Sequence, residues 1–373
     1  MKTIGLCMIA KNEAHIIRRC LDSVLRLIDF FLIVDTGSED GTQQLIRDFL
    51  VEHDARGAVI DEPWQDFAYN RTFALQELRK FADIDYALMI DADDQLVPED
   101  GFDPLAFKSE IQHDLYYVEI RHDEARYFRA QLCNNKLPFY YKGVLHEYLE
   151  IPAGEHTRAT ANGFYIESGR VGARNRNPRK YEDDAALLEE ALLTETDPVL
   201  IRRYKFYLAQ SYRVCGQSEK ALKLHLDRAE MGGWNEELFL SLYNAGLLKE
   251  TLGCSDIEII GTYLKAYDHA PDRIESLHAL VKYCHRNGKP ALGYLIGKQA
   301  ITTPMPEGGL FVQMWIYEYG MLDEFAVAAY WAGHYRESLD ACLKLLANKK
   351  IPADERTRIQ KNADFAREKL DLD

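Results

Sequence analysis

Residues 83–100, DIDYALMIDADDQLVPED, contain an apolar run that ends in three carboxylates, Asp91, Asp93 and Asp94. If the run is a buried strand, Asp91 and Asp93 face the same side, because alternate residues of an extended chain point the same way. Carboxylates at such an edge are hard oxygen ligands, which suit Mg²⁺ or Mn²⁺ shared with phosphate oxygens. The pattern predicts a metal–diphosphate site, and a cap on the turn or helix near Pro98 is the structural alternative.

The elements that must position these carboxylates alternate along about the first hundred residues. Strands are expected at residues 3–10, 29–35, 57–61 and 86–91, and helices at residues 13–27, 40–53 and 67–82. Strands separated by helices of this length favour a mostly parallel sheet with both faces covered, which binds ligands beyond the carboxyl ends of its strands. The expected fold class is therefore α/β and Rossmann-like, with VDTGSEDGT and IDADD at one edge of the sheet.

From about Tyr181 onward, one helical pattern follows another. The turn glycines Gly216, Gly253, Gly288 and Gly333 lie 37, 35 and 45 residues apart, close to the period of about 34 residues in tetratricopeptide repeats. This spacing predicts an all-α, TPR-like repeat domain, in which the aromatic stripes pack in the core.

Composition limits the classes of function. The chain has 373 residues, enough for two domains, and its 45 Lys and Arg against 60 Asp and Glu give a formal net charge of −15. That charge argues against nucleic acid or an anionic membrane as a partner. The seven cysteines form no CxxC pair and are expected to be reduced, packed thiols. Charged and polar residues from Lys11 onward interrupt the apolar start, so neither a signal peptide nor a membrane span is expected, and the localisation expected is cytoplasmic.

Three further motifs accompany IDADD in a fixed order, namely CMIAKNEAHIIRRCLDSV, VDTGSEDGT and EPWQDFAYNRTFAL. As a set they resemble glycosyltransferase family 2, the inverting nucleotide-sugar enzymes of GT-A fold. The following segment, RYFRAQLCNNKLPFYYKGVLHEYLE, is similar to family members with a C-terminal helical repeat domain. The resemblance implies a GT-A catalytic domain at residues 1–168, a basic linker or loop at 169–182 and a TPR-like domain at 183–373.

The resemblance also implies how the nucleotide is held. Asp35 matches the aspartate that accepts from a nucleobase N–H, with Ala10 and Asn12 lining the loop beside it. A carboxylate suits the imide edge of uracil, so the donor expected is a UDP-sugar. Arg71 matches the basic residue that reaches the nucleotide or the donor sugar, although Thr72 stands where many members have Asn.

For the diphosphate, the resemblance implies that Asp91 lies nearer the ribose and that Asp93 is the direct ligand of Mn²⁺ or Mg²⁺. Asp94 is a second candidate ligand. His146 is expected to help hold the metal or the diphosphate, or else to be a hydrogen-bonded structural residue. The cation would neutralise the charge that builds on the leaving group.

Inversion requires a base that deprotonates the acceptor on the face opposite the leaving group. Glu147, in GVLHEYL, is the first candidate because the family places an acidic or imidazole cluster there. Asp123 and Glu124, in RHDEARY, are the rival candidates.

A basic segment, SGRVGARNRNPRK, follows the acidic motifs. Its arginines, Arg174 and Arg176 among them, could form a mobile loop that closes over the diphosphate. The alternative is a solvated linker whose charges balance the acidic segment that follows.

Together these features predict a metal-dependent, inverting glycosyltransferase. Nucleotidyl transfer would require a glycine-rich basic loop after the first strand, and AKNEAH contains none. The alternative is an inactive GT-A-like module whose repeats bind a protein partner. The sequence leaves the acceptor open among saccharides, lipids and peptides, and self-association through the helical domain is a further expectation.

Overall fold

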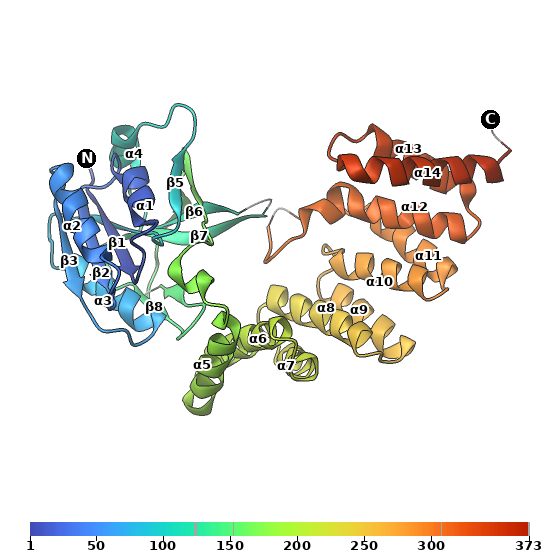
Figure 1. Cartoon of the computed structure of the whole chain (residues 1–373), viewed down its shortest axis with the longest axis horizontal. Coiled ribbons are helices and arrows are strands. Elements are labelled where there is room, and N and C mark those ends of the chain that lie inside the picture. Colours follow the sequence, from blue (N-terminus) through green and yellow to red (C-terminus); the bar gives the residue numbers. More distant parts are fainter. Residues whose placement is uncertain (123–124, 152, 307, 372–373) are drawn as a thin grey trace. The chain divides into compact units, whose positions relative to one another are not determined.

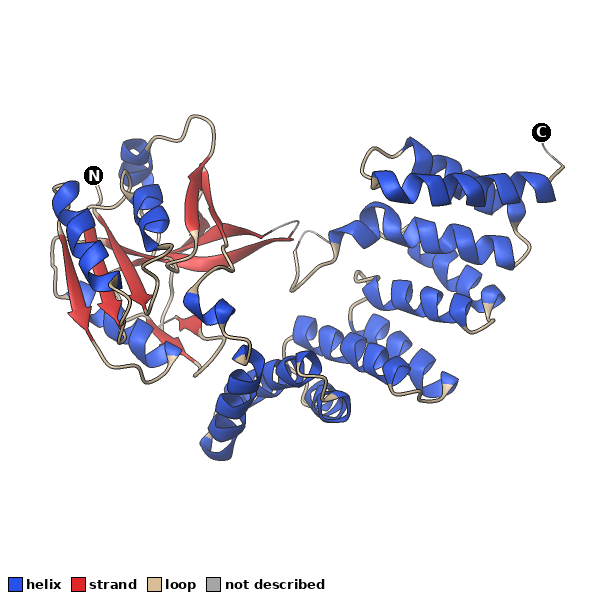
Figure 2. Ribbon diagram, viewed as in Figure 1, coloured by secondary structure: helices blue, strands red, loops and turns tan. Residues whose placement is uncertain are grey.

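The computed structural model describes residues 1–122, 125–151, 153–306 and 308–371. The chain forms two compact units, residues 1–200 and residues 201–373, and strands occur only in the first of them within the described residues (Figures 1 and 2). The first unit thus extends past the expected linker at 169–182, and the expected domain boundaries stay a prediction.

The first unit is built on a large mixed sheet. Its strands are β1 (Ile4–Ala10), β2 (Phe30–Asp35), β3 (Gly57–Asp61), β4 (Tyr86–Met89), β5 (Gln95–Pro98), β6 (Leu115–His122), β7 (Ala125–Asn134), β8 (Tyr140–Lys142), β9 (Tyr148–Glu150), β10 (Arg158–Thr160) and β11 (Phe164–Glu167). Its helices are α1 (Ile17–Val24), α2 (Thr42–Glu52), α3 (Phe67–Arg79), α4 (Pro104–Glu110), the short 3-10 helix η1 (Ala173–Arg176) and α5 (Lys180–Thr194). Each strand and helix expected before residue 92 is present.

The strands lie in the order β3-β2-β1-β4-β7-β6-β11-β5, with β10 paired to β6 and with β8 and β9 in a separate hairpin. Strands β3, β2, β1 and β4 are parallel, whereas β7 is antiparallel to both β4 and β6. The expected mostly parallel sheet domain, followed by a helical domain, is confirmed.

Alternate residues of the central strands explain why helices cover both faces of the sheet. Leu6 and Ile33 belong to a core that includes residues of α1 and α2, whereas Cys7 and Leu32 belong to a core that includes residues of α3. Strands buried on both sides read as continuous apolar runs, and all six residues of β2 are buried.

The register of the parallel strands brings their carboxyl ends to one edge. Ala10 pairs with Asp35, and Asp35 pairs with Asp61. Strand β4 ends at Met89, two residues before Asp91. The acidic motifs therefore share the edge at which sheets of this type bind ligands.

In the described residues of the second unit, every regular element is a helix. Its helices are α6 (Pro198–Val214, which begins in the first unit), α7 (Ser218–Glu230), α8 (Asn235–Thr251), α9 (Asp256–His269), α10 (Glu275–Arg286), α11 (Pro290–Ala300), the π-helical turn η2 (Ile316–Gly320), α12 (Met321–Trp331), α13 (Tyr335–Ala347) and α14 (Ala353–Lys369). The four turn glycines follow α6, α8, α10 and α12, and each has a positive φ, which glycine adopts at little cost at a helix end. Across the described parts of both units, no helix is long and apolar enough to cross a bilayer.

Candidate active site

Asp35 is a buried carboxylate at the end of β2, with 1% of its surface exposed. Its Oδ1 accepts hydrogen bonds from the backbone N–H groups of Gly37 (3.0 Å) and Ser38 (2.8 Å) and from the Gln43 side chain (3.0 Å). Its Oδ2 is buried and accepts no hydrogen bond from the described residues. Because an unsatisfied buried acceptor is costly, this oxygen is suited to an N–H donor on a ligand.

Ala10 and Asn12 shape the loop beside Asp35. The carbonyl of Ala10 accepts from the N–H of Thr36 at 2.9 Å. Asn12 has a left-handed backbone, with φ 58°, and its side-chain oxygen accepts from the N–H of Glu39 at 2.8 Å. The Asn12 side chain thus ties the loop after β1 to the loop after β2.

Arg71, on α3, joins two parts of the candidate site. Its Nη2 lies 2.5 Å from Oδ1 of Asp91, its Nε lies 2.6 Å from Oε1 of Glu147, and its guanidinium lies 5.6 Å from the centre of the Tyr141 ring. Only 13% of the Arg71 side chain is exposed. The structure therefore brings the candidate base, Glu147, and the first carboxylate of IDADD, Asp91, into contact with the same guanidinium.

Arg129, on β7, is a residue of this cluster that the motif reasoning missed. Its Nη2 lies 3.6 Å from Oδ2 of Asp91 and 3.8 Å from Oδ2 of Asp94. Burial tends to raise the pKa of Asp91, but the charges of Arg71 and Arg129 lower it to about 2. Arg129 stands in the segment RYFRAQ, but its closeness to Asp91 depends on the pairing of β7 with β4, which the segment itself does not indicate.

Asp94 differs from Asp91 in its pKa. It is 3% exposed, and its Oδ1 accepts from the N–H of Gly169 at 3.0 Å. Burial, followed by the charge of Asp91, raises the pKa of Asp94 to about 7. Neighbouring carboxyl groups with such different pKa values are typical of functional sites.

The cation expected at Asp93 fits if the donor supplies most of its ligands. Oδ2 of Asp93 accepts from the N–H of Gly172 at 3.0 Å, which leaves Oδ1 of the same carboxylate for a metal. No group of three or more His, Cys, Asp and Glu side chains arranged to hold a metal occurs in the described part of the chain. His146 is exposed, with φ 53°. Mg²⁺ often takes only one or two protein carboxylates plus phosphate oxygens, so a site with few protein ligands is compatible with a cation. The assignment of the cation to Asp91, Asp93 and His146 stays a prediction.

Residues 168–173, which we call the strap, contain the N–H groups that bind Asp93 and Asp94. A third strap N–H, that of Ala173, donates to Oε1 of Glu13 at 3.0 Å. A Cβ on Gly169 would lie 2.0 Å from the Asp93 carbonyl oxygen, so only glycine allows this approach. Burial raises the pKa of Glu13, and its Oε2 accepts no hydrogen bond from the described residues.

The two arginines after the strap do not both face the acidic edge. Arg174 forms an ion pair with Asp184 on α5 and lies 4.6 Å from the centre of the Phe67 ring. Arg176 is exposed. Contact of either arginine with a donor stays a prediction.

Of the two candidate bases, Glu147 and Asp123, only Glu147 lies among the described residues. Glu147, with 13% of its side chain exposed, joins the site through Arg71. Asp123 and its neighbour Glu124 lie outside the described residues.

The geometry of this edge agrees with a comparison against protein families. Residues 6–172 match the family described as Glycosyl transferase family 2. These residues form a family 2 glycosyltransferase domain. The resemblance inferred from the motifs is confirmed, and the acidic edge lies within the matched residues.

Proteins similar to parts of this chain include a glycosyltransferase and a TPR repeat-containing protein. An uncharacterized glycosyltransferase of Rickettsia prowazekii is 28% identical over 158 residues, which are 42% of this chain and 46% of the relative. The chain thus matches under half of that relative's length. A TPR repeat-containing protein of Synechococcus elongatus is 33% identical over 100 residues, 26% of this chain and 22% of that protein.

A crystal structure of S. aureus TarS 1-349 in complex with UDP-GlcNAc is also similar, at 15% identity and a TM-score of 0.37. The alignment covers 72% of this chain and 91% of that chain.

Proposed function

We propose that this chain is an inverting glycosyltransferase that moves a sugar from a UDP-sugar to an acceptor hydroxyl with the help of a divalent cation. The observation that carries the proposal is the unpartnered Oδ2 of Asp35, buried at the carboxyl edge of a family 2 domain. Uracil presents an N–H donor at its imide edge, which would satisfy this oxygen. The hydrogen bonds to Oδ1 hold the Asp35 carboxylate in a fixed orientation before the nucleobase binds.

In this proposal the diphosphate lies near Asp91 and Asp93. Asp93 would hold Mn²⁺ or Mg²⁺, which when bound neutralises charge on the leaving diphosphate. Arg129 and Arg71 are the fixed cations closest to Asp91. They keep that carboxylate ionised, so it can accept a hydrogen bond from the ribose.

Glu147 is the proposed base. As the acceptor oxygen attacks the anomeric carbon, Glu147 takes the hydroxyl proton, and the bond from that carbon to the diphosphate oxygen breaks. Arg71 holds Glu147 through Nε and is therefore a positioning residue in this account. Because Arg71 also holds Asp91, the base keeps a fixed place relative to the donor.

A screen of nucleotide sugars tests the proposal. UDP-, GDP-, CDP- and ADP-sugars are incubated with the full chain, with Mn²⁺ or with EDTA, and released nucleotide is measured. Hydrolysis of a UDP-sugar that requires Mn²⁺ or Mg²⁺ is expected, because water can take the place of the acceptor hydroxyl when no acceptor is added. Absence of turnover and of UDP binding would favour the alternative, an inactive module whose repeats bind a partner.

The remaining expectations stand as parts of the same proposal. The acceptor is a saccharide, lipid or peptide, nucleic acid is not a partner, the site of action is the cytoplasm, and the helical unit is the proposed surface for self-association. The net charge of −15 supports the absence of a nucleic-acid partner.

A further inference from the structure

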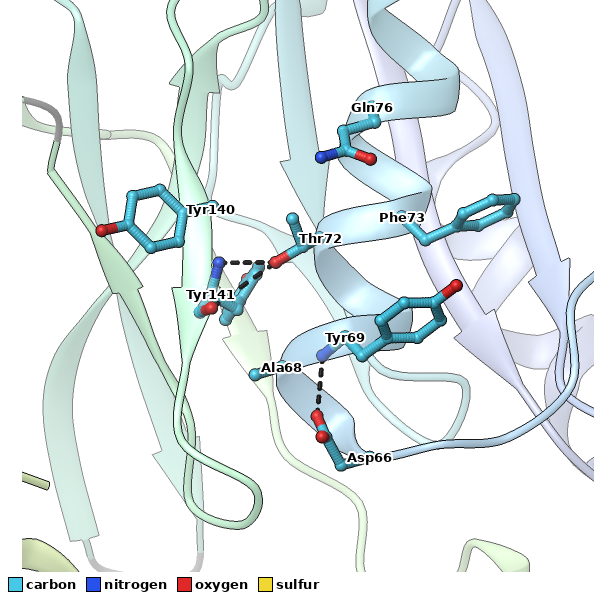
Figure 3. Close-up of a pocket in the computed structure, with 8 residues that line it drawn as sticks. All are labelled: Asp66, Ala68, Tyr69, Thr72, Phe73, Gln76, Tyr140 and Tyr141. Atoms are coloured by element: carbon cyan, nitrogen blue, oxygen red, sulfur yellow. Dashed lines mark hydrogen bonds between the residues drawn. The ribbon is translucent and has the colours of Figure 1, made fainter. Parts of the chain in front are cut away.

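A groove outside the acidic edge follows helix α3 where it lies beside strand β8. Its cavity volume is about 280 Å³, just below the range of about 300–1,000 Å³ for small-molecule sites. In Figure 3, Thr72 and Ala68 lie between Tyr140 on one side and Tyr69 and Phe73 on the other. The complete lining is Asp66, Ala68, Tyr69, Thr72, Phe73, Gln76, Tyr140 and Tyr141.

The two sides of this groove are fixed by hydrogen bonds and ring contacts. The Thr72 hydroxyl oxygen accepts from the N–H of Tyr141 at 2.9 Å, which ties α3 to β8. The Asp66 carboxylate caps α3 by accepting from the N–H of Tyr69 at 2.7 Å. The rings of Tyr69 and Phe73 stack with centroids 6.5 Å apart. The groove is therefore formed before any ligand binds.

The lining residues define the chemistry of a ligand. They include no Lys, Arg or His and one carboxylate, that of Asp66, so they would repel a diphosphate rather than bind it. Tyr69 and Tyr140 are each 38% exposed and offer apolar ring surface next to the amide of Gln76 and the hydroxyl of Thr72. Ring faces beside a few hydrogen-bonding groups suit a neutral molecule with both apolar C–H faces and hydroxyl groups.

We propose that this groove binds a neutral pyranose unit of the acceptor, one that lies beyond the reacting unit. The inference rests on the proposed glycosyltransferase function. Tyr141 links the groove to the site, because it lines the groove and its ring lies beside the Arg71 guanidinium, which binds Glu147. Strand β8 also leads directly into the loop that carries Glu147.

Saturation-transfer NMR on the full chain tests this site with defined probes. The probes are methyl β-glucoside, methyl β-galactoside, cellotetraose and maltotetraose. We expect saturation transfer to at least one of them. We also expect Tyr140→Ala to weaken that binding by roughly 2- to 10-fold, the range for loss of one aromatic contact, and Tyr140→Phe to restore it.

Ala68→Leu provides a second variant, since it fills the groove without removing a ring. Phe365→Ala is the matched control, because Phe365 is 52% exposed on α14, outside the groove. The groove inference predicts that Ala68→Leu weakens binding of the same probe and that Phe365→Ala does not. Equal binding by the wild type and Ala68→Leu would overturn it.

UDP binding, measured by calorimetry on the same samples, separates this inference from the proposed function. If wild-type protein binds UDP but gives no saturation transfer to any probe, the inference that the groove binds a pyranose is overturned and the proposed function is left intact. Protein that binds neither would contradict both. Binding of a tetrasaccharide without binding of the methyl glycosides would support a unit within a glycan, and binding of a methyl glycoside alone would support recognition of a single sugar.

Discussion

Buried charges are arranged differently in the two units of the chain. In the helical unit, Arg228 and Arg273 are fully buried, and each is paired with carboxylates that are themselves held. Arg228 Nη2 lies 2.9 Å from Glu237, and Arg273 Nη2 lies 2.8 Å from Glu275. Arg273 also binds Glu236 and the carbonyl of Leu310.

At the edge of the sheet, by contrast, two carboxylates keep an unused oxygen. Oδ2 of Asp35 and Oε2 of Glu13 accept no hydrogen bond from the described residues, and Asp91 remains 31% exposed despite its two arginine neighbours. Evolution retains such groups at a cost in stability when they bind a ligand. The comparison teaches that buried ion pairs occur in both units, since Arg71 and Glu147 also form one at the sheet edge, whereas the buried carboxylate oxygens without a partner among the described residues lie at the sheet edge.

The largest effect on stability is expected from removing the cation of a buried ion pair in the helical unit. Arg273→Met leaves the buried Glu275 and the partly buried Glu236 without their cation, which should lower the free energy of unfolding by about 3–5 kcal/mol. Urea unfolding of the full chain measures this loss. Arg18→Met is the control, because Arg18 and its partner Glu52 form an exposed pair, with side chains 45% and 52% exposed, and such pairs are worth about 0–1 kcal/mol. Equal losses in the two variants would contradict the structural role of the Arg273 cluster.

The next largest effect concerns turnover. Asp93→Ala should reduce cation-dependent donor turnover by about 10²–10³-fold, the typical cost of removing one group that stabilises developing charge. The unfolding midpoint should change little, since Asp93 is partly exposed. Cation binding can be followed independently by the relaxation of water protons around Mn²⁺. Full activity of the variant, or of the wild type in EDTA, rules out the metal role.

Glu147→Gln tests the base. Transfer should fall by about 10²-fold, while UDP binding should stay nearly unchanged, because the base acts only as the acceptor attacks. Acceptor assays and calorimetry on one protein batch separate the two quantities. Asp123→Asn is the companion variant, and the assignment moves to Asp123 if transfer survives in Glu147→Gln and collapses in Asp123→Asn.

The smallest effect is expected at the strap. A Cβ on Gly172 would lie 3.0 Å from Oδ2 of Asp93 and 3.1 Å from Oε1 of Glu13. Gly172→Ala should therefore loosen the strap and speed amide hydrogen exchange of residues 169–173 by roughly five-fold, equivalent to about 1 kcal/mol of local stability. Gly261→Ala is the control, because a Cβ there meets nothing within 4 Å. Unchanged exchange in Gly172→Ala would mean that these hydrogen bonds do not hold the strap.

The sequence could predict those features that depend on short stretches of chain. Strands β1 to β4 and their helices follow from local apolar periodicity, and the places of Asp35 and Asp91 follow from the strand ends. The turn glycines of the helical unit were recognisable by their spacing.

Contacts between distant segments could not be predicted in this way. Arg71 meets Glu147 across 76 positions of the sequence, and Ala173 meets Glu13 across 160. Arg129 reaches Asp91 because β7 inserts between β4 and β6, which no local pattern indicates. Arg174 pairs with Asp184, only ten positions away, and its contact with a diphosphate stays a prediction.

Nucleotide binding to Asp35→Asn tests the central claim, that the unused oxygen at the sheet edge receives a nucleobase N–H. The asparagine keeps Oδ1 for Gly37 and Ser38 but presents an N–H₂ group in place of Oδ2. Uracil offers a donor at N3, whereas cytosine offers an acceptor. We predict that UDP binds the variant about 10- to 150-fold more weakly, the range for a hydrogen bond to a charged group, and that CDP gains relative to UDP. Calorimetry that finds equal UDP affinity in wild type and variant would contradict the account.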